Sequence, residues 1–288
     1  MHYKQYKSIL SAQNGMNLYR GCTHGCIYCD SRSLCYQFDH DFEDIEVKTD
    51  AVAMLERELR RKRKPCMVGT GAMCDPYTHL ETELCVTRQS LEVILRYGFG
   101  LSIQTKSARI LRDIDLLDAI NQQTKCVVQM TLTTHDDELC RILEPNVSVT
   151  SERFDALCAL RERGIPTVVW ISPILPFIND TCENLLGLLD YCTRADVRGI
   201  MFFGAGMTLR DGNREYFYRA LDRHFPDVKQ RYIERFGNAY VCNSPRDAEL
   251  TALVDAETKK RGMIFGNDAV FAYLRKFDDS AARQVTLF

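Results

Sequence analysis

The sequence predicts an α/β protein, built as an open partial barrel of six β/α units with a helical C-terminal extension. Two observations support this prediction. Short apolar segments alternate repeatedly with amphipathic segments, as expected for parallel strands joined by helical crossovers. The apolar segments are also rich in β-branched residues, which is typical of strands that are buried on both faces.

The expected elements follow one another in a regular order. We expect strands at residues 16–22, 66–72, 101–107, 126–134, 166–175 and 198–206. Amphipathic patterns between them predict helices at residues 51–63, 83–97, 112–121, 151–163 and 182–192. Because six units are fewer than the eight of a closed barrel, the barrel stays open. Its functional residues should lie on the loops that follow the C-terminal ends of the strands.

The chain divides into three predicted parts. Residues 1–211 form the barrel together with a cysteine-rich N-terminal loop, and residues 212–275 form a more polar, helical extension. Residues 276–288 are polar except for two terminal apolar side chains, which indicates a flexible tail.

Composition sets limits on the compartment and on the partners. The chain has 288 residues and a net charge of -2, so it has no general attraction to phosphate groups. We expect neither a membrane span nor a secretory signal, because no apolar run is long enough, and we expect a cytoplasmic location. The 13 cysteines are odd in number and lie mostly in apolar segments, which favours a reducing compartment.

Three of these cysteines need an explanation of their own. Cys22, Cys26 and Cys29 have the spacing C-x3-C-x2-C, and we predict that they are metal ligands. Structural zinc usually takes four ligands in paired C-x2-C units, and Cys35 and His24 are candidate fourth ligands with unusual spacing. A [4Fe–4S] cluster takes one thiolate per iron, so three cysteines would leave one iron open to a substrate or cofactor. We favour this second interpretation.

The loop "YRGCTHGCIYCDSR" resembles the cluster loop of the radical S-adenosylmethionine (SAM) superfamily. The stretches "GTGAMCDPYTHLETE", "IQTKSARILRDIDLL" and "LEPNVSVTSERFDALCALRERGIP" resemble its spore photoproduct lyase-like branch, also described as DNA repair photolyase-like. The resemblance covers about residues 17–180 and implies a partial TIM-like radical SAM barrel. It also implies a [4Fe–4S] cluster, SAM bound at the open iron, and reductive cleavage of SAM to a 5′-deoxyadenosyl radical. An electron donor such as flavodoxin or ferredoxin would be needed.

The resemblance also assigns expected roles to individual residues that bind the cofactor. Lys106 would meet the carboxylate of SAM, and Asp75 lies in the loop that would hold its methionine part. Tyr28 would lie near the adenine, or would simply be an aromatic side chain packed beside the cluster. Thr131 and Thr133 would contact ribose hydroxyls, or would be ordinary β-branched strand residues.

Two further expectations concern the ends of strands. Gly204 and Gly206 would allow close approach of a flat ligand such as adenine, unless they are ordinary turn residues. In the photoproduct lyases a cysteine in the loop after the second strand returns a hydrogen atom to the product radical. Cys74 lies in that loop, one position after the expected place, which Met73 occupies. Cys74 is therefore a candidate hydrogen donor, with a buried inert thiol as the alternative.

The substrate suggested by the resemblance is a nucleic acid. Five arginines that follow strand ends are candidates for a basic rim: Arg109, Arg112, Arg141, Arg210 and Arg214. The last five residues resemble the peptide by which bacterial repair proteins bind the sliding clamp: Gln284, Val285, Thr286, Leu287 and Phe288. The alternative for this tail is packing onto its own domain.

We therefore predict a lyase-like radical SAM enzyme that acts on nucleic acid, by lesion repair or base modification. One alternative keeps the radical chemistry and directs it to a protein, a peptide or a small molecule. The other is a zinc-binding structural or adaptor protein that docks a partner through its C-terminal tail.

Overall fold

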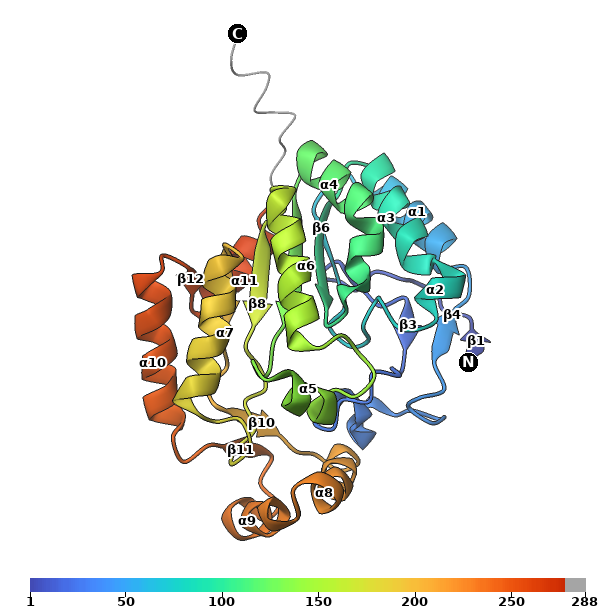
Figure 1. Cartoon of the computed structure of the whole chain (residues 1–288). Helices are drawn as coiled ribbons and strands as arrows, with labels where there is room; N and C mark the ends of the chain where they lie inside the picture. Colours follow the sequence, from blue (N-terminus) through green and yellow to red (C-terminus); the bar gives the residue numbers. More distant parts are fainter. Residues whose placement is uncertain (278–288) are drawn as a thin grey trace.

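The computed structural model describes residues 1–277 of the chain. Its centre is a seven-stranded parallel sheet with the order β12-β9-β8-β7-β6-β5-β2 (Figure 1). The strands are β2 (Gly15–Met16), β5 (Met67–Thr70), β6 (Gly100–Thr105), β7 (Cys126–Thr131), β8 (Thr167–Trp170), β9 (Gly199–Met201) and β12 (Ile264–Phe265). Strands β5 to β9 are neighbours in chain order, as in a barrel. The predicted α/β class and open partial barrel are thus confirmed.

A layer of helices covers the outer face of the sheet (Figure 1). These helices are α1 (Ala51–Arg61), α3 (Val86–Arg96), α4 (Ile114–Gln123), α6 (Thr150–Glu162) and α7 (Cys182–Arg194). All six residues of β7 are buried, because helices cover one face and the barrel interior lies against the other. This explains the continuous apolar runs of the sequence, since a strand buried on both faces has no exposed face on which polar residues would alternate with apolar ones.

The first predicted strand, residues 16–22, is divided between two sheets. Strand β2 pairs with β5 in the large sheet, and β3 (Tyr19–Arg20) pairs antiparallel with β4 (Glu46–Lys48). Strand β4 also pairs with β1 (His2–Lys4), which makes a separate three-stranded sheet. By changing sheets, the chain carries the cysteine-rich loop across the end of the barrel.

The region 212–275 contains four helices, as well as two short strands. The helices are α8 (Asn213–His224), α9 (Pro226–Phe236), α10 (Asp247–Lys260) and α11 (Asn267–Arg275). Strand β11 (Val241–Asn243) pairs with β10 (Gly206–Thr208), and β12 adds a seventh strand to the large sheet beside β9. Part of the extension therefore completes the sheet. In Figure 1, β10, β11, α8 and α9 lie together at one end of the molecule.

None of the helices within residues 1–277 combines the length and the apolar character needed to cross a bilayer.

Candidate active site

The three clustered cysteines lie at the C-terminal ends of the central strands. They line a cavity of about 90 Å³, called here the cysteine cavity. His24 of the same loop also lines it. Its other walls come from the loop after β5, from the end of β6 and from the last residue of β7, and they include Cys74, Asp75, Lys106 and Thr131. Because parallel strands end at the same edge of the sheet, residues that are distant in sequence meet here.

The cysteine loop is held by backbone contacts at several points. The Cys22 amide donates to the Phe42 carbonyl at 3.0 Å, and the Ile27 amide donates to the Leu143 carbonyl at 2.9 Å. Gly21 has φ of +89°, and a Cβ atom there would lie 2.5 Å from the Phe42 carbonyl oxygen. Only glycine fits this position. The turn that places Cys22 at the cavity therefore requires the glycine of the sequence "RGC".

The clustered thiols are free, and Cys26 is buried. Burial and the nearby Asp75 raise the pKa of Cys22 to about 12, and burial also raises the pKa of Cys26. Without a metal these two groups are thiols at neutral pH, whereas coordination to a metal deprotonates a thiol. Cys35, an alternative fourth ligand, is exposed and contacts Arg210 Nη1 at 3.1 Å instead of lining this cavity.

Asp75 braces the loop after β5 against the end of β6. Its Oδ1 accepts from the Tyr77 amide at 2.8 Å and the Thr105 hydroxyl at 2.7 Å. Its Oδ2 accepts from the Lys106 amide at 2.7 Å and lies 3.6 Å from His24 Nδ1. Both carboxylate oxygens are therefore engaged by protein donors, and a contribution of Asp75 to cofactor binding would come through the position of its loop.

A buried ion pair lies behind the cavity, and sequence reasoning missed it. Arg153 Nη2 lies 2.5 Å from Glu144 Oε2, and both side chains are fully buried. Arg153 also donates to the Thr131 carbonyl, and Tyr28 donates its hydroxyl to Glu144. Burial alone would raise the pKa of Glu144, but Arg153 and Lys106 outweigh it and hold that pKa below its ordinary value.

Lys106 is the cationic side chain on the cavity wall. Burial opposes its charge, yet the negative charges of Cys26, when deprotonated, and of Glu144 raise the pKa of Lys106 above its ordinary value. The ammonium group therefore stays protonated at neutral pH, as the predicted contact with a carboxylate requires.

Two buried polar atoms on the cavity wall have no hydrogen-bond partner among residues 1–277. They are Nε2 of His24 and Oγ1 of Thr131. Buried polar atoms are normally paired, so these two indicate that a polar ligand belongs in the cavity. Thr133 also has an unpaired hydroxyl, but it lies outside the residues that line this cavity.

Cys74 lies on the same wall as a buried thiol. Its Sγ donates to the Gly21 carbonyl at 2.7 Å, and burial raises its pKa well above the ordinary value. It is therefore a protonated thiol beside the cysteine loop. Its neighbour Met73 lines this cavity and the larger one described next. The role of Cys74 as a hydrogen donor stays a prediction.

A second cavity of about 470 Å³, called here the outer cavity, adjoins the first. The two share Cys29, Met73 and Lys106 as wall residues. Gly206 lines the outer cavity, where its backbone packs against Asn243, whereas Gly204 packs against Asp247. At both glycines a Cβ atom would come within 3.0 Å of these neighbours.

Aromatic side chains form much of the outer cavity wall: Tyr28, Tyr36, Trp170 and Phe203. Phe203 is 55% exposed, and its ring lies 5.6 Å from that of Trp170. Trp170 is oriented by its indole N–H, which donates to Gln129 Oε1 at 2.8 Å. The pair therefore presents a fixed aromatic surface to solvent at this cavity.

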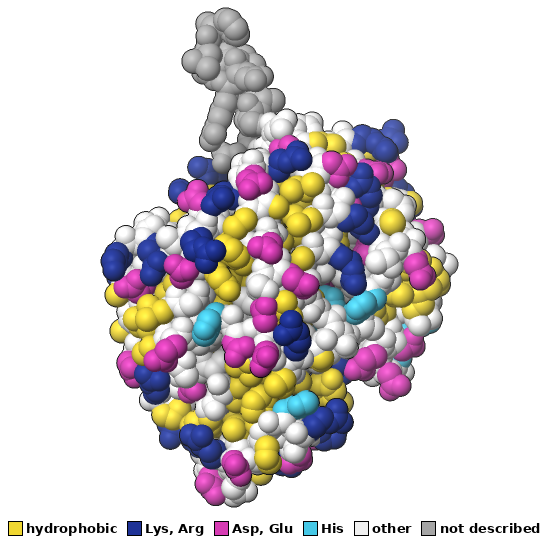
Figure 2. Space-filling model, viewed as in Figure 1, with side chains coloured by type: hydrophobic (Ala, Val, Ile, Leu, Met, Phe, Trp, Pro, Cys, Tyr) yellow, Lys and Arg dark blue, Asp and Glu magenta, His cyan; other side chains and the backbone are white. Residues whose placement is uncertain are grey.

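Most arginines of the predicted basic rim are engaged by protein groups. Arg112 pairs with Glu81 and Asp113, and Arg214 is buried against the carbonyls of Leu209, Gly237 and Ala239. Arg109 donates to the Tyr77 carbonyl, Arg210 contacts Asp30 and Tyr240, and Arg141 lies exposed on α5 (Asp137–Leu143). Figure 2 shows Lys and Arg side chains interspersed with Asp and Glu on one face.

The fold and this site define a class of protein. Residues 16–189 match the radical SAM superfamily, and the chain belongs to that superfamily. An uncharacterized protein of Mycobacterium tuberculosis is 32% identical over 229 residues, which are 77% of this chain and 66% of that protein. The alignment thus spans slightly less than two thirds of the relative's length.

Solved structures show the same fold. A spore photoproduct lyase variant with bound AdoMet and dinucleoside spore photoproduct has a TM-score of 0.60 at 15% identity. The match covers 85% of this chain and 72% of the lyase chain. The methyltransferase TsrM from Kitasatospora setae, with tryptophan and a SAM analog bound, has a TM-score of 0.56 at 15% identity. That match covers 84% of this chain and 51% of TsrM.

Enzymes of this superfamily use a [4Fe–4S] cluster and SAM, and the site fits both groups. Three free thiols line one cavity, as a cluster with an open iron requires. Lys106 and the two unpaired buried atoms on the same wall suit the polar groups of SAM.

Replacing Lys106 with Met should weaken SAM binding and leave the iron content unchanged. A hydrogen bond between charged groups contributes about 1.5–3 kcal/mol, so the Kd of SAM should rise roughly 10- to 150-fold. Equilibrium binding of SAM to the reconstituted protein measures this, with Lys259→Met on the exposed face of α10 as the control. Unchanged affinity in Lys106→Met would remove Lys106 from the SAM site.

Proposed function

We propose that this chain is a lyase-like radical SAM enzyme that acts on a base of a nucleic acid, by lesion repair or base modification. The observation that carries the proposal is the exposed ring of Phe203 against Trp170, on the wall of the outer cavity. Unstacked bases bind to proteins largely by stacking on aromatic side chains. Lys106 and Cys29 line this cavity and the cysteine cavity, so a base held there would lie next to the cofactor site.

The residues have distinct proposed roles. Cys22, Cys26 and Cys29 hold the cluster, and Lys106 pairs with the carboxylate of SAM. When bound, the two groups supply a 5′-deoxyadenosyl radical that abstracts a hydrogen atom from the substrate. The protein's own contribution is to orient the substrate and exclude water, and the aromatic walls of the outer cavity suit both tasks.

Single-stranded or distorted nucleic acid is the substrate form that the site favours. A base inside a duplex must leave the stack to reach a cavity, at a cost of a few kcal/mol that is smallest for damaged or unpaired bases. The net charge of -2 and the engaged arginines offer little general attraction to phosphate, so recognition would depend on the base.

Replacing Phe203 with Ala should selectively impair the reaction with nucleic acid. Stacking on one aromatic side chain contributes about 1–3 kcal/mol, so the affinity for an ultraviolet-irradiated oligonucleotide should fall roughly 5- to 150-fold. Cleavage of SAM without substrate should stay at the wild-type rate. The measurement is 5′-deoxyadenosine formation with irradiated DNA, intact DNA, RNA and peptides. Leu186→Ala, which removes an exposed apolar side chain from α7, is the control.

The outcome separates the proposal from its alternatives. Stimulation of SAM cleavage by a peptide or an amino acid, with no response to any nucleic acid, would favour a protein or small-molecule substrate. The structural likeness to TsrM keeps this alternative in view, since that enzyme's structure holds tryptophan. The proposed sliding-clamp peptide, Gln284 to Phe288, lies outside the described residues and stays a prediction.

A further inference from the structure

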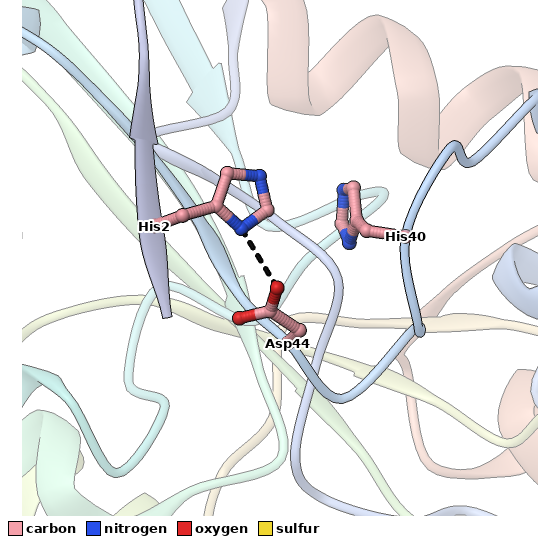
Figure 3. A group of neighbouring side chains, drawn as sticks. All are labelled: His2, His40 and Asp44. Atoms are coloured by element: carbon pink, nitrogen blue, oxygen red, sulfur yellow. Dashed lines mark hydrogen bonds and ion pairs between the residues drawn. The ribbon is translucent and has the colours of Figure 1, made fainter.

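A second group of metal-binding side chains lies in the small N-terminal sheet. His2 comes from β1, Glu46 from β4, and His40 and Asp44 from the loop before β4. The rings of His2 and His40 lie 4.6 Å apart, and Figure 3 shows both close to Asp44. Ligand atoms of His2, His40 and Asp44 lie within 4.8 Å of one another, as do those of Asp39, His40 and Glu46.

Hydrogen bonds define which nitrogen of each ring is free. His2 Nδ1 lies 2.9 Å from Asp44 Oδ2, and His40 Nδ1 lies 2.9 Å from the Asp41 carbonyl oxygen. Carboxylate and carbonyl oxygens only accept hydrogen bonds, so both Nδ1 atoms carry the proton. In a neutral ring the Nε2 atom then carries the lone pair. Metal-binding histidines commonly have this arrangement, in which the other ring N–H donates to a carboxylate or a carbonyl oxygen.

Both Nε2 atoms face the same carboxylate oxygen. Glu46 Oε2 lies 3.7 Å from His40 Nε2 and 3.9 Å from His2 Nε2, and the Glu46 side chain is fully buried. Among residues 1–277, His40 Nε2 has no hydrogen-bond partner, and the Lys4 ammonium is the cation that lies beside Glu46 Oε2. The His40 side chain is only 10% exposed, and its unpaired Nε2 therefore indicates that a ligand belongs beside it.

We propose that His2, His40 and Glu46 bind a divalent metal ion of the zinc class, separate from the iron–sulfur site. Two imidazoles and one carboxylate are a ligand set that zinc takes, with bonds of about 2.0–2.2 Å. Tetrahedral ligands at that bond length lie about 3.4 Å apart, so each of the two nitrogens needs to approach Glu46 Oε2 by only a few tenths of an ångström. Asp44 and the Asp41 carbonyl orient the two rings, and the Tyr6 hydroxyl donates to the other oxygen of Glu46.

Lys4 is the resident cation that a metal would replace. Its Nζ lies 3.2 Å from Glu46 Oε2 and 3.3 Å from Asp39 Oδ2, and its side chain is 40% exposed. The N-terminal amine lies 2.9 Å from Asp44 Oδ1, outside the three proposed ligands. Because Lys4 lies near the surface, its ammonium group can swing into solvent when a metal enters.

The site has a structural consequence for the cysteine loop. The proposed ligands join β1, β4 and the segment 37–44, and Phe42 in that segment accepts from the Cys22 amide. A bound metal would therefore fix the segment that supports Cys22 from outside the cavity.

The test uses Co2+ as a spectroscopic probe on a full chain without a polyhistidine tag. The background variant carries Cys22→Ala, Cys26→Ala and Cys29→Ala, so that these three thiols cannot bind the probe. We expect one Co2+ per chain, with visible absorption typical of nitrogen and oxygen ligands and no sulfur-to-cobalt charge-transfer band. His40→Gln and His2→Gln should each abolish binding, and Asp44→Asn should weaken it about tenfold.

Matched variants make the result decisive. His224→Gln removes an exposed histidine on α8 and should leave binding unchanged. Lys4→Met should bind Co2+ more tightly, because it removes the competing charge. Zn2+ should raise the Tm of the background protein and not that of His40→Gln, whose fold is checked by circular dichroism. Absence of binding by the background protein, or equal binding by folded His40→Gln, would overturn the proposal.

Discussion

Replacing Cys29 with Ala should reduce 5′-deoxyadenosine formation to the background of the assay. Cys29 lines both the cysteine cavity and the outer cavity. A [4Fe–4S] cluster takes one thiolate per iron. Only two of the three protein thiolates remain in Cys29→Ala, so a second iron is left without a protein ligand. The protein is reconstituted anaerobically with iron and sulfide and reduced with dithionite in the presence of SAM. Iron content and 5′-deoxyadenosine are then measured on the same sample.

Cys158→Ala is the matched control for this experiment. Cys158 is a free, half-buried cysteine on α6, outside the two cavities. It should retain wild-type iron content and activity, which separates the loss of a cluster ligand from the loss of any thiol. Wild-type turnover in Cys29→Ala would show that the cluster is held elsewhere. Stoichiometric zinc without iron in the wild type would instead support a structural metal at the three cysteines.

Replacing Arg153 with Met should lower the free energy of unfolding by about 3–5 kcal/mol, the cost of leaving a buried charge without its partner. Arg153 and Glu144 are fully buried. The change also leaves the carbonyls of Thr131 and Ser148 without the donors that Arg153 supplies. Denaturant unfolding measures the effect. Lys259→Met breaks an exposed i,i+4 pair on α10 and should cost less than about 1 kcal/mol.

The loss of stability caused by Arg153→Met should depend on pH in a defined direction. In the wild type the pKa of Glu144 is below its ordinary value of 4.5, so its stabilising contribution is present above that pH and is lost as the pH falls further. Without Arg153, burial raises the pKa of Glu144. Ionisation of Glu144 above pH 4.5 then opposes folding. The difference between Arg153→Met and the wild type should therefore be larger at pH 7 than near pH 4. A constant difference, or full stability at pH 7, would contradict this account.

Adding Glu144→Gln to Arg153→Met should restore part of the lost stability, since the second change removes the unpaired charge. A double variant that is less stable than Arg153→Met would show that hydrogen bonds of Glu144, such as that from Tyr28, outweigh its buried charge.

The sequence by itself determined those features that depend on local spacing and on the pattern of strands and helices. Cys22, Cys26 and Cys29 lie within eight residues, so their convergence needs little beyond one loop. Lys106 and Thr131 lie in the C-terminal halves of two predicted strands, so the shared edge of a parallel sheet brings them to the same cavity.

Other features could not be read from the sequence, because they depend on contacts between distant segments. Tyr28 and Glu144 are 116 residues apart, and no local pattern marks them as partners. The segment 264–265 is too short to be predicted as a strand, and it becomes β12 only because β9 offers a free edge. Likewise, His2, His40 and Glu46 lie side by side only after β1 pairs with β4. Tertiary packing decides which polar atoms are buried together, and local propensity carries no information about that choice.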